Sequence, residues 1–355
     1  METASNEFNG RDLSQEKAIE FGLPMFGSIR DALLMGGDKL AVDGVIFIGE
    51  HGYYPSSEFG VKLYPRKEMF DEIVSVFQET GQSVPVFCDK HLSWNSEWAQ
   101  EMYETAKKMD FPLFAGSSIS WAGTIPDIYP KTHIKIEEAV AIYYGGYEVY
   151  GIHSLEFLQS IVELRGGGEA GIKTITAYIG DQVWAAMERG EFSSELFKAA
   201  LGVAQHLKEG NIRELTQSTD SKPWEQPLIA YIFEHRDGLK STHVMLEGAV
   251  ADFTAAYKHA DTGEIMAGCS YSSWGGPPNH YGHFATLCSR IDQMMLTGKA
   301  PCASERTLLT TRAIAACVIA VQQPGIKLET PELMISYTQE PMAQLVSDRV
   351  RMISG

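Results

Sequence analysis

The chain has 355 residues, 44% of them hydrophobic, a size and composition that predict two folded domains. Its formal net charge of −17 disfavours nucleic acid and anionic membranes as partners. The five cysteines lack C-x-x-C spacing, which predicts free thiols in a reducing compartment. No signal-peptide pattern or membrane-length apolar run is present, so we expect a cytoplasmic protein.

The first part of the chain alternates helices with short apolar strands. The apolar run at 42–49 predicts a strand buried on both faces of a parallel sheet. The order β-α-β-α-β that follows predicts an α/β domain at 1–120. In chain order the expected elements are helices at 12–21 and 28–37, a strand at 42–49, a helix at 65–80, a strand at 84–88, a helix at 95–109 and a strand at 112–115.

After residue 120 the pattern changes to longer strands mixed with helices. Asp237-Gly238 between two strand-like halves of 227–248 is a strong hairpin signal. This part predicts an α+β domain at 121–355 with a mainly antiparallel sheet. Its other expected elements are strands at 137–151 and 172–180, a helix at 153–168, a helical region at 181–208, strands up to about 272, and helices at 283–298 and 304–322.

Polar residues follow each of the three predicted parallel strands. Ligands bind at the carboxyl edge of such a sheet, so these residues predict a binding site there. The alternative, that they cap helices or pair with one another in solvent, stays open. The residues are Glu50 and His51 after the first strand, Asp89, Lys90 and His91 after the second, and Ser117 after the third.

Lys90 is the first catalytic candidate, because an ammonium group beside a carboxylate can orient a hydroxyl or stabilise an alkoxide. His153 is the second, and Glu156 shares its helical face. A lone histidine at a helix start is nevertheless more often structural. His243 and Glu247, on a predicted strand, carry a weaker signal.

The stretch "RGGGEAG" at 165–171 is similar to a phosphate-binding glycine loop. Such a loop must follow a strand, and this one follows a predicted helix. We therefore interpret it as a helix stop.

Four blocks carry a family resemblance: "VDGVIFIGEHGYYP", "VPVFCDKHLSWNSEWAQEMYETAKKMDFPLFAGSS", "YGGYEVYGIHSLEFL" and "HFATLCSRIDQMMLTGKAPCASERTLLTTRAIAACVIA". In this order they resemble the Gfo/Idh/MocA family of nicotinamide-dependent sugar and cyclitol oxidoreductases. The likeness is most marked with a poorly characterised bacterial branch that has Glu-His-Gly and Asp-Lys-His at these places. It covers nearly the whole chain and is specific in the order of its blocks.

The resemblance implies a Rossmann-like first domain, NAD or NADP as cofactor, and a sugar, cyclitol or related polyhydroxylated substrate. It also implies a homodimer or homotetramer, because one face of the family's antiparallel sheet is commonly open for association. Asp89-Lys90-His91 stands where the family has Glu-Lys-Pro, whose lysine reaches nicotinamide and substrate. His153 matches the histidine of the family's Asp-x-x-x-His relay, but Val149 replaces the aspartate.

The resemblance assigns roles to nine residues. The catalytic residues would be Lys90, His153 and Glu148, which neighbours the lost aspartate position; the cofactor would contact Glu50, His51, Asp89 and Lys90; the substrate would contact His91, Ser117 and Glu156.

The front of the chain departs from the family, which begins with a strand, a G-x-G-x-x-G turn and a second strand. None of the three precedes residue 42. Without that turn a pyrophosphate loses its main-chain donors, so we expect weak dinucleotide binding. The first domain would be N-terminally incomplete, and the strand at 42–49 would have an unpaired edge or a borrowed partner. Either the chain is a shortened form or this branch binds its ligand differently.

Two other functions stay open. One is a non-redox lyase, isomerase or hydrolase that uses a divalent metal such as Zn, Mn or Fe. The other is a binding protein that keeps the fold without the chemistry. The metal ligands in the first case would be Glu50, His51, Asp89, His91, His153 and Glu156.

Overall fold

The computed structural model describes residues 14–49, 54–218, 222–271 and 282–340. The chain divides into two compact units. Unit 1 comprises Met1–Ala115 and Ile291–Ser304, and unit 2 comprises Gly116–Arg290 and Glu305–Gly355.

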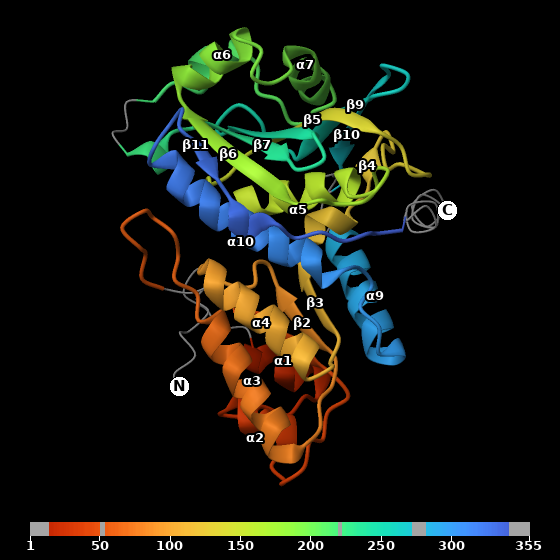
Figure 1. The fold of residues 1–355 in the computed structure, drawn as a ribbon. Helices are drawn as coiled ribbons and strands as arrows, with labels where there is room; N and C mark the ends of the chain where they lie inside the picture. The colour runs from red at the N-terminus through yellow and green to blue at the C-terminus, as the bar shows by residue number, and fades with distance from the viewer. Residues whose placement is uncertain (1–13, 50–53, 219–221, 272–281, 341–355) are drawn as a thin grey trace. The chain divides into compact units, whose positions relative to one another are not determined.

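Unit 1 contains a three-stranded sheet in which β1 and β2 are parallel and β3 lies beside β2. Helices alternate with these strands, so the β-α-β-α-β order is confirmed (Figure 1). The elements are α1 (Ser14–Phe21), α2 (Ile29–Leu34), β1 (Val45–Phe47), α3 (Arg66–Thr80), β2 (Val86–Asp89), α4 (Ser96–Lys108) and β3 (Leu113–Gly116).

Helix α3 buries an apolar stripe at helical spacing. Phe70, Ile73 and Phe77 are each 1% exposed. The ring centroid of Phe70 lies 6.4 Å from that of Phe47 in β1, and that of Phe77 lies 5.4 Å from that of Phe111. These contacts fix α3 against the sheet and place the first turn of α3 after the carboxyl end of β1.

Strand β1 is not buried on both faces, and that expectation is wrong. Val45 and Phe47 are 8% and 5% exposed, whereas Ile46 and Ile48 are 55% and 59% exposed. Among the described residues β1 pairs with β2 alone, and residues 14–41 contribute helices to this unit. Strand β1 is therefore an edge strand with one covered face in the described part of the chain.

In unit 2 the described residues form an eight-stranded sheet. Its neighbouring strands are antiparallel except for β5 and β8, which confirms a mainly antiparallel sheet. The hairpin at Asp237-Gly238 is also confirmed, since β7 and β8 pair on either side of it. The strand order is β11 (Lys327–Glu329), β6 (Ile172–Ile179), β7 (Leu228–His235), β8 (Lys240–Leu246), β5 (Ile136–Tyr143), β9 (Thr254–His259), β10 (Ile265–Ser270) and β4 (Thr124–Ile125).

Helices cover both faces of this sheet. Helices α6 (Asp181–Glu188) and α7 (Ser194–Gly202) lie on one face, and α5 (Gly151–Val162) and α10 (Ser304–Val321) lie on the other (Figure 1). The core under α6 and α7 includes Val183, Leu196 and Val244, each fully buried. The prediction of a homodimer or homotetramer assumed that one face of this sheet is open. That assumption is wrong for this unit, because helices cover both faces. The homodimer or homotetramer stays a prediction.

Five further elements complete the described chain. They are the 3-10 helices η1 (Ser118–Trp121), η2 (Pro223–Glu225) and η3 (Pro331–Leu333), and the α-helices α8 (Ile212–Leu215) and α9 (Gly282–Thr297).

The strand predicted at 137–151 ends early, at Tyr143, and α5 starts at Gly151. Gly145 has φ +85°, a conformation that breaks a strand and that glycine adopts readily. The residues between therefore form a turn that aims the start of α5.

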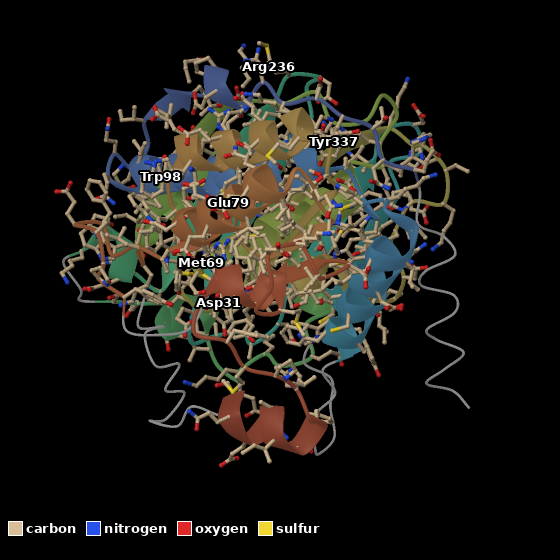
Figure 2. All side chains as sticks on the ribbon, turned by 90° about the horizontal axis from the view of Figure 1, so that it is seen from below. Asp31, Met69, Glu79, Trp98, Arg236 and Tyr337 are labelled. Atoms are coloured by element: carbon tan, nitrogen blue, oxygen red, sulfur yellow. The ribbon has the colours of Figure 1, made fainter. Side chains whose placement is uncertain are left out.

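Helix α5, predicted to run to 168, ends at Val162 with Glu163 as its C-cap, and the glycine stretch lies in the loop that follows. Gly168 and Gly171 have φ +74° and +92°. A Cβ on Gly168 would lie 2.5 Å from the carbonyl oxygen of Tyr337, and one on Gly171 would lie 2.7 Å from that of Leu333. The C-terminal segment that carries Tyr337, labelled in Figure 2, thus occupies the space that a phosphate would need.

Candidate functional site

Three consecutive ionisable residues lie at the end of β2 in unit 1. Asp89, Lys90 and His91 are 8%, 7% and 3% exposed. The peptide bond between Lys90 and His91 is cis. Burial of ionisable groups is unfavourable unless other groups compensate for the lost water. Pairing in open solvent, the alternative interpretation of this corner, is therefore excluded. Glu50 and His51 lie outside the described residues.

Arg66 is the functional candidate that sequence reasoning missed. It is the first residue of α3, is 1% exposed, and its Nε and Nη1 have no hydrogen-bond partner among the described residues. The guanidinium stacks on Tyr64, with Cζ 4.5 Å from the ring centroid. The sequence signal is weak: a cation in a first helical turn, where the helix dipole disfavours it.

The side chain of Arg66 lies at the carboxyl end of the parallel strands. A Cβ placed on Gly49, just after β1, would lie 3.8 Å from Cγ of Arg66 and 2.8 Å from Sδ of Met69, which Figure 2 labels. Burial raises the pKa of the Cys88 thiol at the end of β2, and the charge of Arg66 partly opposes that rise. Cys88 is thus a neutral thiol, and Arg66 is the buried positive charge beside it.

Helix α3 has no side-chain cap at its start. Pro65 occupies the N-cap position, and its side chain makes no capping hydrogen bond. The early N–H groups of a helix have no partner within the helix and favour anions. Arg66 and this helix start therefore form an arrangement suited to a phosphate or carboxylate group.

In unit 2 the structure brings together Ser117 and His153, which are 36 residues apart. The Oγ of Ser117 lies 2.5 Å from Nδ1 of His153 and also accepts a hydrogen bond from the N–H of Ile119 at 3.0 Å. Ser117 is fully buried and His153 is half-buried. The rings of Tyr150 and Phe253 contact the His153 ring edge-to-face, with centroids at 5.7 and 5.9 Å.

Glu156 belongs to the same cluster and is 1% exposed. Thr310 donates to its Oε1 at 2.6 Å, and the N–H of Ser117 also donates to its carboxylate. Burial raises the pKa of Glu156, although Arg306 and these donors oppose the rise. A Cβ on Gly116 would lie 2.5 Å from Oε2 of Glu156, so only glycine fits there. Glu156 is thus a buried group that holds the main chain at Ser117.

Three other residues singled out from the sequence, Glu148, His243 and Glu247, lie outside this cluster of hydrogen bonds. Glu148 is 3% exposed in the turn before α5, and its catalytic role stays a prediction. The Nδ1 of His243 shares a hydrogen bond with the hydroxyl of Ser154 at 2.9 Å. Burial, and to a smaller extent the charge of His235, lowers the pKa of His243 to about 3. His243 is therefore a neutral core histidine. Glu247 accepts a hydrogen bond from the N–H of Gly145.

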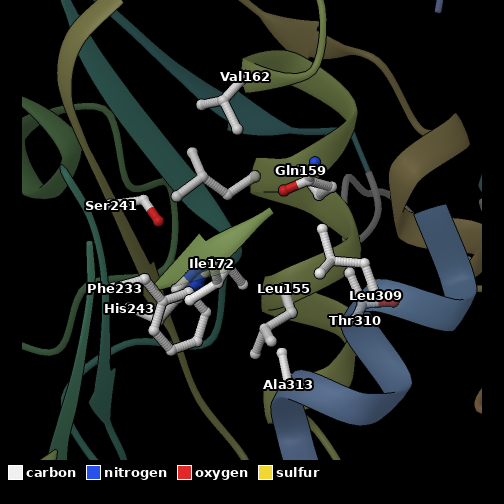
Figure 3. A pocket seen from close by; sticks show the side chains of 11 residues that line it. Leu155, Gln159, Val162, Ile172, Phe233, Ser241, His243, Leu309, Thr310 and Ala313 are labelled. Carbon is white, nitrogen blue, oxygen red and sulfur yellow. The ribbon is translucent and has the colours of Figure 1, made fainter. Parts of the chain in front are cut away.

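One internal cavity lies between α5, α10 and the sheet of unit 2 (Figure 3). Its volume of about 10 Å³ leaves room for about one water molecule. Its polar lining residues are Gln159, Ser241, His243 and Thr310, and the rest of its lining is apolar. A sugar or a nicotinamide ring does not fit, so this cavity is not a substrate site.

A metal centre finds no support in the described part of the chain. Within residues 14–49, 54–218, 222–271 and 282–340 no group of three or more His, Cys, Asp or Glu residues could hold an ion. Two of the six proposed ligands, Glu50 and His51, fall outside those ranges.

Several solved dehydrogenases share the fold of this chain. GenD2 from gentamicin A biosynthesis, solved in complex with NAD, is 12% identical with a TM-score of 0.55 over 90% of this chain and 87% of its own. A myo-inositol dehydrogenase from Corynebacterium glutamicum is 12% identical, with a TM-score of 0.54 over 92% and 93%. The WlbA dehydrogenase from Bordetella pertussis, in complex with NADH and UDP-GlcNAcA, is 10% identical, with a TM-score of 0.52 over 89% and 86%.

The chain has the fold of these dehydrogenases. At 10–12% identity the likeness establishes the α/β architecture, with a Rossmann-like sheet and a second sheet domain. No family model and no curated protein matches the sequence. None of the described helices is both long enough and apolar enough to cross a bilayer.

Proposed function

We propose that the chain is an NAD(P)-dependent oxidoreductase acting on a sugar, a cyclitol or a related polyhydroxylated molecule. The observation that carries this proposal is the fold shared over most of both chains with dehydrogenases such as GenD2 and a myo-inositol dehydrogenase. The buried Asp89-Lys90-His91 corner and the Ser117–His153 pair supply the groups that such chemistry needs.

The residues present fit a dinucleotide in one respect that sequence reasoning did not foresee. The two Arg66 donors that have no partner among the described residues, and the start of α3 without a side-chain cap, suit a phosphate group. Asp89 and Lys90, with Glu50 and His51, are the other residues proposed to hold the cofactor. When bound, the nicotinamide would exchange a hydride with the carbinol carbon of the substrate.

The chain's own residues would handle the substrate hydroxyl. Lys90 is proposed to exchange the hydroxyl proton, because an ammonium group stabilises an alkoxide and a buried lysine can give up its proton. His153 is the second residue proposed to take part in proton transfer, and its Nδ1 lies against the Oγ of Ser117. His91 and Glu156 are proposed to position the substrate, Glu156 acting through the main chain at Ser117.

The test is turnover with a panel of inositols, hexoses and nucleotide sugars in the presence of NAD or NADP. We expect reduced nicotinamide to form with at least one panel member. Lys90→Met should lower kcat by about 10²–10⁴-fold, the usual contribution of a general acid or base. Lys108→Met, at an exposed position late in α4, is the matched control and should keep full activity.

A Lys90→Met variant with the same kcat as the wild type would contradict the catalytic role of this lysine. Turnover that depends on added Mn²⁺ or Zn²⁺ and not on NAD or NADP would favour the metal-assisted alternative instead.

A further inference from the structure

The internal cavity of unit 2 brings together polar side chains from β8 and α5 (Figure 3). Ser241 and His243 are two residues apart in β8, so their side chains point to the same face of the sheet, the one that α5 covers (Figure 1). Gln159 belongs to α5. The chemistry of each side chain fixes how many hydrogen bonds it can donate and accept. The groups that these residues still offer to the cavity can therefore be deduced.

Gln159 offers its amide oxygen. Its Nε2 has two hydrogens, and both are used, one on Oε2 of Glu169 and one on the hydroxyl of Tyr337, each at 2.8 Å. That hydroxyl itself donates to Glu163, so it accepts from the amide nitrogen, which fixes the orientation of the amide. Within the described residues Oε1 of Gln159 makes no hydrogen bond, although the side chain is only 6% exposed. Buried oxygens without a partner are rare in folded proteins.

The ring of His243 offers a donor. Its Nδ1 lies 2.9 Å from Oγ of Ser154, which is 0% exposed and has no other side-chain partner in the described chain. The serine hydrogen therefore goes to an unprotonated Nδ1, since the opposite direction would bury that hydrogen without an acceptor. Burial also keeps the ring neutral by lowering its pKa. The ring hydrogen then lies on Nε2, which makes no hydrogen bond to the described residues.

Ser241 supplies a second acceptor. Its Oγ lies 2.9 Å from Nε2 of His235, and whichever of the two atoms donates, the hydroxyl oxygen keeps a lone pair. The side chain is buried. The remaining polar residue of the lining, Thr310, donates to Glu156. The cavity is thus lined by one N–H donor and two oxygen acceptors that can still form hydrogen bonds.

These three groups match one water molecule. A buried water typically makes about three hydrogen bonds, and it can accept and donate at once. A cation would face the N–H and an anion would face the two oxygens, so a neutral ligand fits best. The volume of about 10 Å³ excludes a larger ligand. No hydrogen bond joins His243, Gln159 and Ser241 directly to one another within the described residues, so a bridging molecule is needed to satisfy all three.

We propose that this cavity is a binding site for one ordered water molecule, which accepts a hydrogen bond from Nε2–H of His243 and donates to Oε1 of Gln159 and to Oγ of Ser241. The water connects β8 to α5 at a second point, next to the direct contact between His243 and Ser154. Helix α5 also carries His153, so the water helps to fix the helix that holds this candidate residue. The site does not depend on the proposed oxidoreductase function.

The test is NMR of the full-length protein, isotope-labelled at the histidine ring nitrogens. The signals of His243 are those that disappear in His243→Phe. We expect Nε2 to be protonated and Nδ1 to be unprotonated, with a nuclear Overhauser cross peak from the Nε2 hydrogen to a long-lived water. His133 is the internal control, because its Nδ1 lies 3.1 Å from the carbonyl oxygen of Leu164 and must be protonated there.

A matched pair of variants in α10 tests where the water lies. Ala313 lines the cavity, whereas Ala316 is buried on the same helix outside the lining. Ala313→Val fills the cavity and should remove the water cross peak, while Ala316→Val should keep it. Loss of the cross peak in both folded variants, or in neither, would overturn this location.

A crystal structure of the unmodified protein is a second measurement that needs no variant. One ordered water at about 2.7–3.2 Å from Nε2 of His243 and from Oε1 of Gln159 is the expected result. A cavity without electron density for a water, or a His243 ring with its hydrogen on Nδ1, would overturn the proposal. These results do not affect the oxidoreductase proposal, which is tested by turnover.

Discussion

At the scale of single residues, Arg66 combines complete burial with hydrogen-bonding capacity that the described chain does not use. A buried charge without a paired carboxylate is unfavourable by several kcal/mol. Tyr64 offsets part of this through its ring face, by about 2 kcal/mol at a desolvated site. The rest of this unfavourable free energy would be offset if the guanidinium binds an anionic ligand.

We predict that Arg66→Met preserves or raises the stability of the protein while weakening NADH binding at least tenfold, about 1.4 kcal/mol. Methionine keeps the volume and removes the buried charge. Urea unfolding and a binding titration measure the two effects separately. Arg30→Met is the matched control, because Arg30 is 53% exposed and pairs with Glu79 at the surface.

Strong destabilisation of Arg66→Met together with unchanged binding would show that Arg66 is a packing residue. In that case the cofactor phosphates would have to be held elsewhere.

At the scale of elements, a buried polar network fastens the C-terminal segment to the end of α5. Glu169 accepts hydrogen bonds from Arg165 at 3.0 Å and from Gln159 at 2.8 Å, and its Oε1 lies 3.0 Å from Nδ1 of His235. Gln159 also donates to the hydroxyl of Tyr337 at 2.8 Å. These contacts explain why the loop after α5 holds the C-terminal segment and not a phosphate.

This network should make stability depend on pH. Burial alone would raise the pKa of Glu169, but His235 and Arg165 outweigh it and hold the pKa well below that of an ordinary glutamate. A carboxyl whose folded pKa is depressed stabilises the fold fully above its unfolded pKa and loses this contribution as the pH falls through the folded pKa. The stabilisation from Glu169 should therefore be complete at pH 7 and decline below about pH 4.5.

We predict that Glu169→Gln lowers the free energy of unfolding by about 1.5–3 kcal/mol at pH 7, because Arg165 loses one of its two carboxylate partners and keeps only Asp237. The deficit should shrink when both proteins are unfolded in urea at low pH. Glu332→Gln, at an exposed position of η3, should match the wild type at each pH. A deficit that stays constant on acidification would contradict the ionised state of Glu169.

Elements set by local sequence could be predicted. The hairpin at Asp237-Gly238 and the helices α3 and α4 depend on neighbouring residues and on glycine or capping chemistry. The burial of β1 could not be predicted, because the exposure of Ile46 depends on which other elements cover the strand and not on the apolar run itself. The sequence named Asp89, Lys90, His91 and Ser117 as site candidates after strands, but it could not predict which groups they contact. Their roles stay predictions.

The candidate site shows the same limit. The sequence singled out Ser117, His153 and Glu156, yet it suggested separate roles for them. Their arrangement depends on η1 meeting α5, and the close approach at Gly116 makes room for Glu156. Arg66 was missed because its significance lies in the partners it lacks among the described residues, which no local pattern reveals.

At the scale of the whole molecule, the dehydrogenase fold and the donors around Arg66 lead us to propose that the chain binds a nicotinamide dinucleotide. Because the only anion-binding groups that we identify are the start of α3 and the guanidinium of Arg66, we expect this binding to be weak but measurable.

The most direct test is calorimetric titration of the 355-residue chain with NAD, NADH, NADP and NADPH. We predict saturable binding of at least one of them, with a dissociation constant near the millimolar range, roughly 4 kcal/mol of binding free energy. Arg66→Met should weaken that binding. Absence of saturation with all four dinucleotides, in a protein shown to be folded, would contradict the proposed dinucleotide binding.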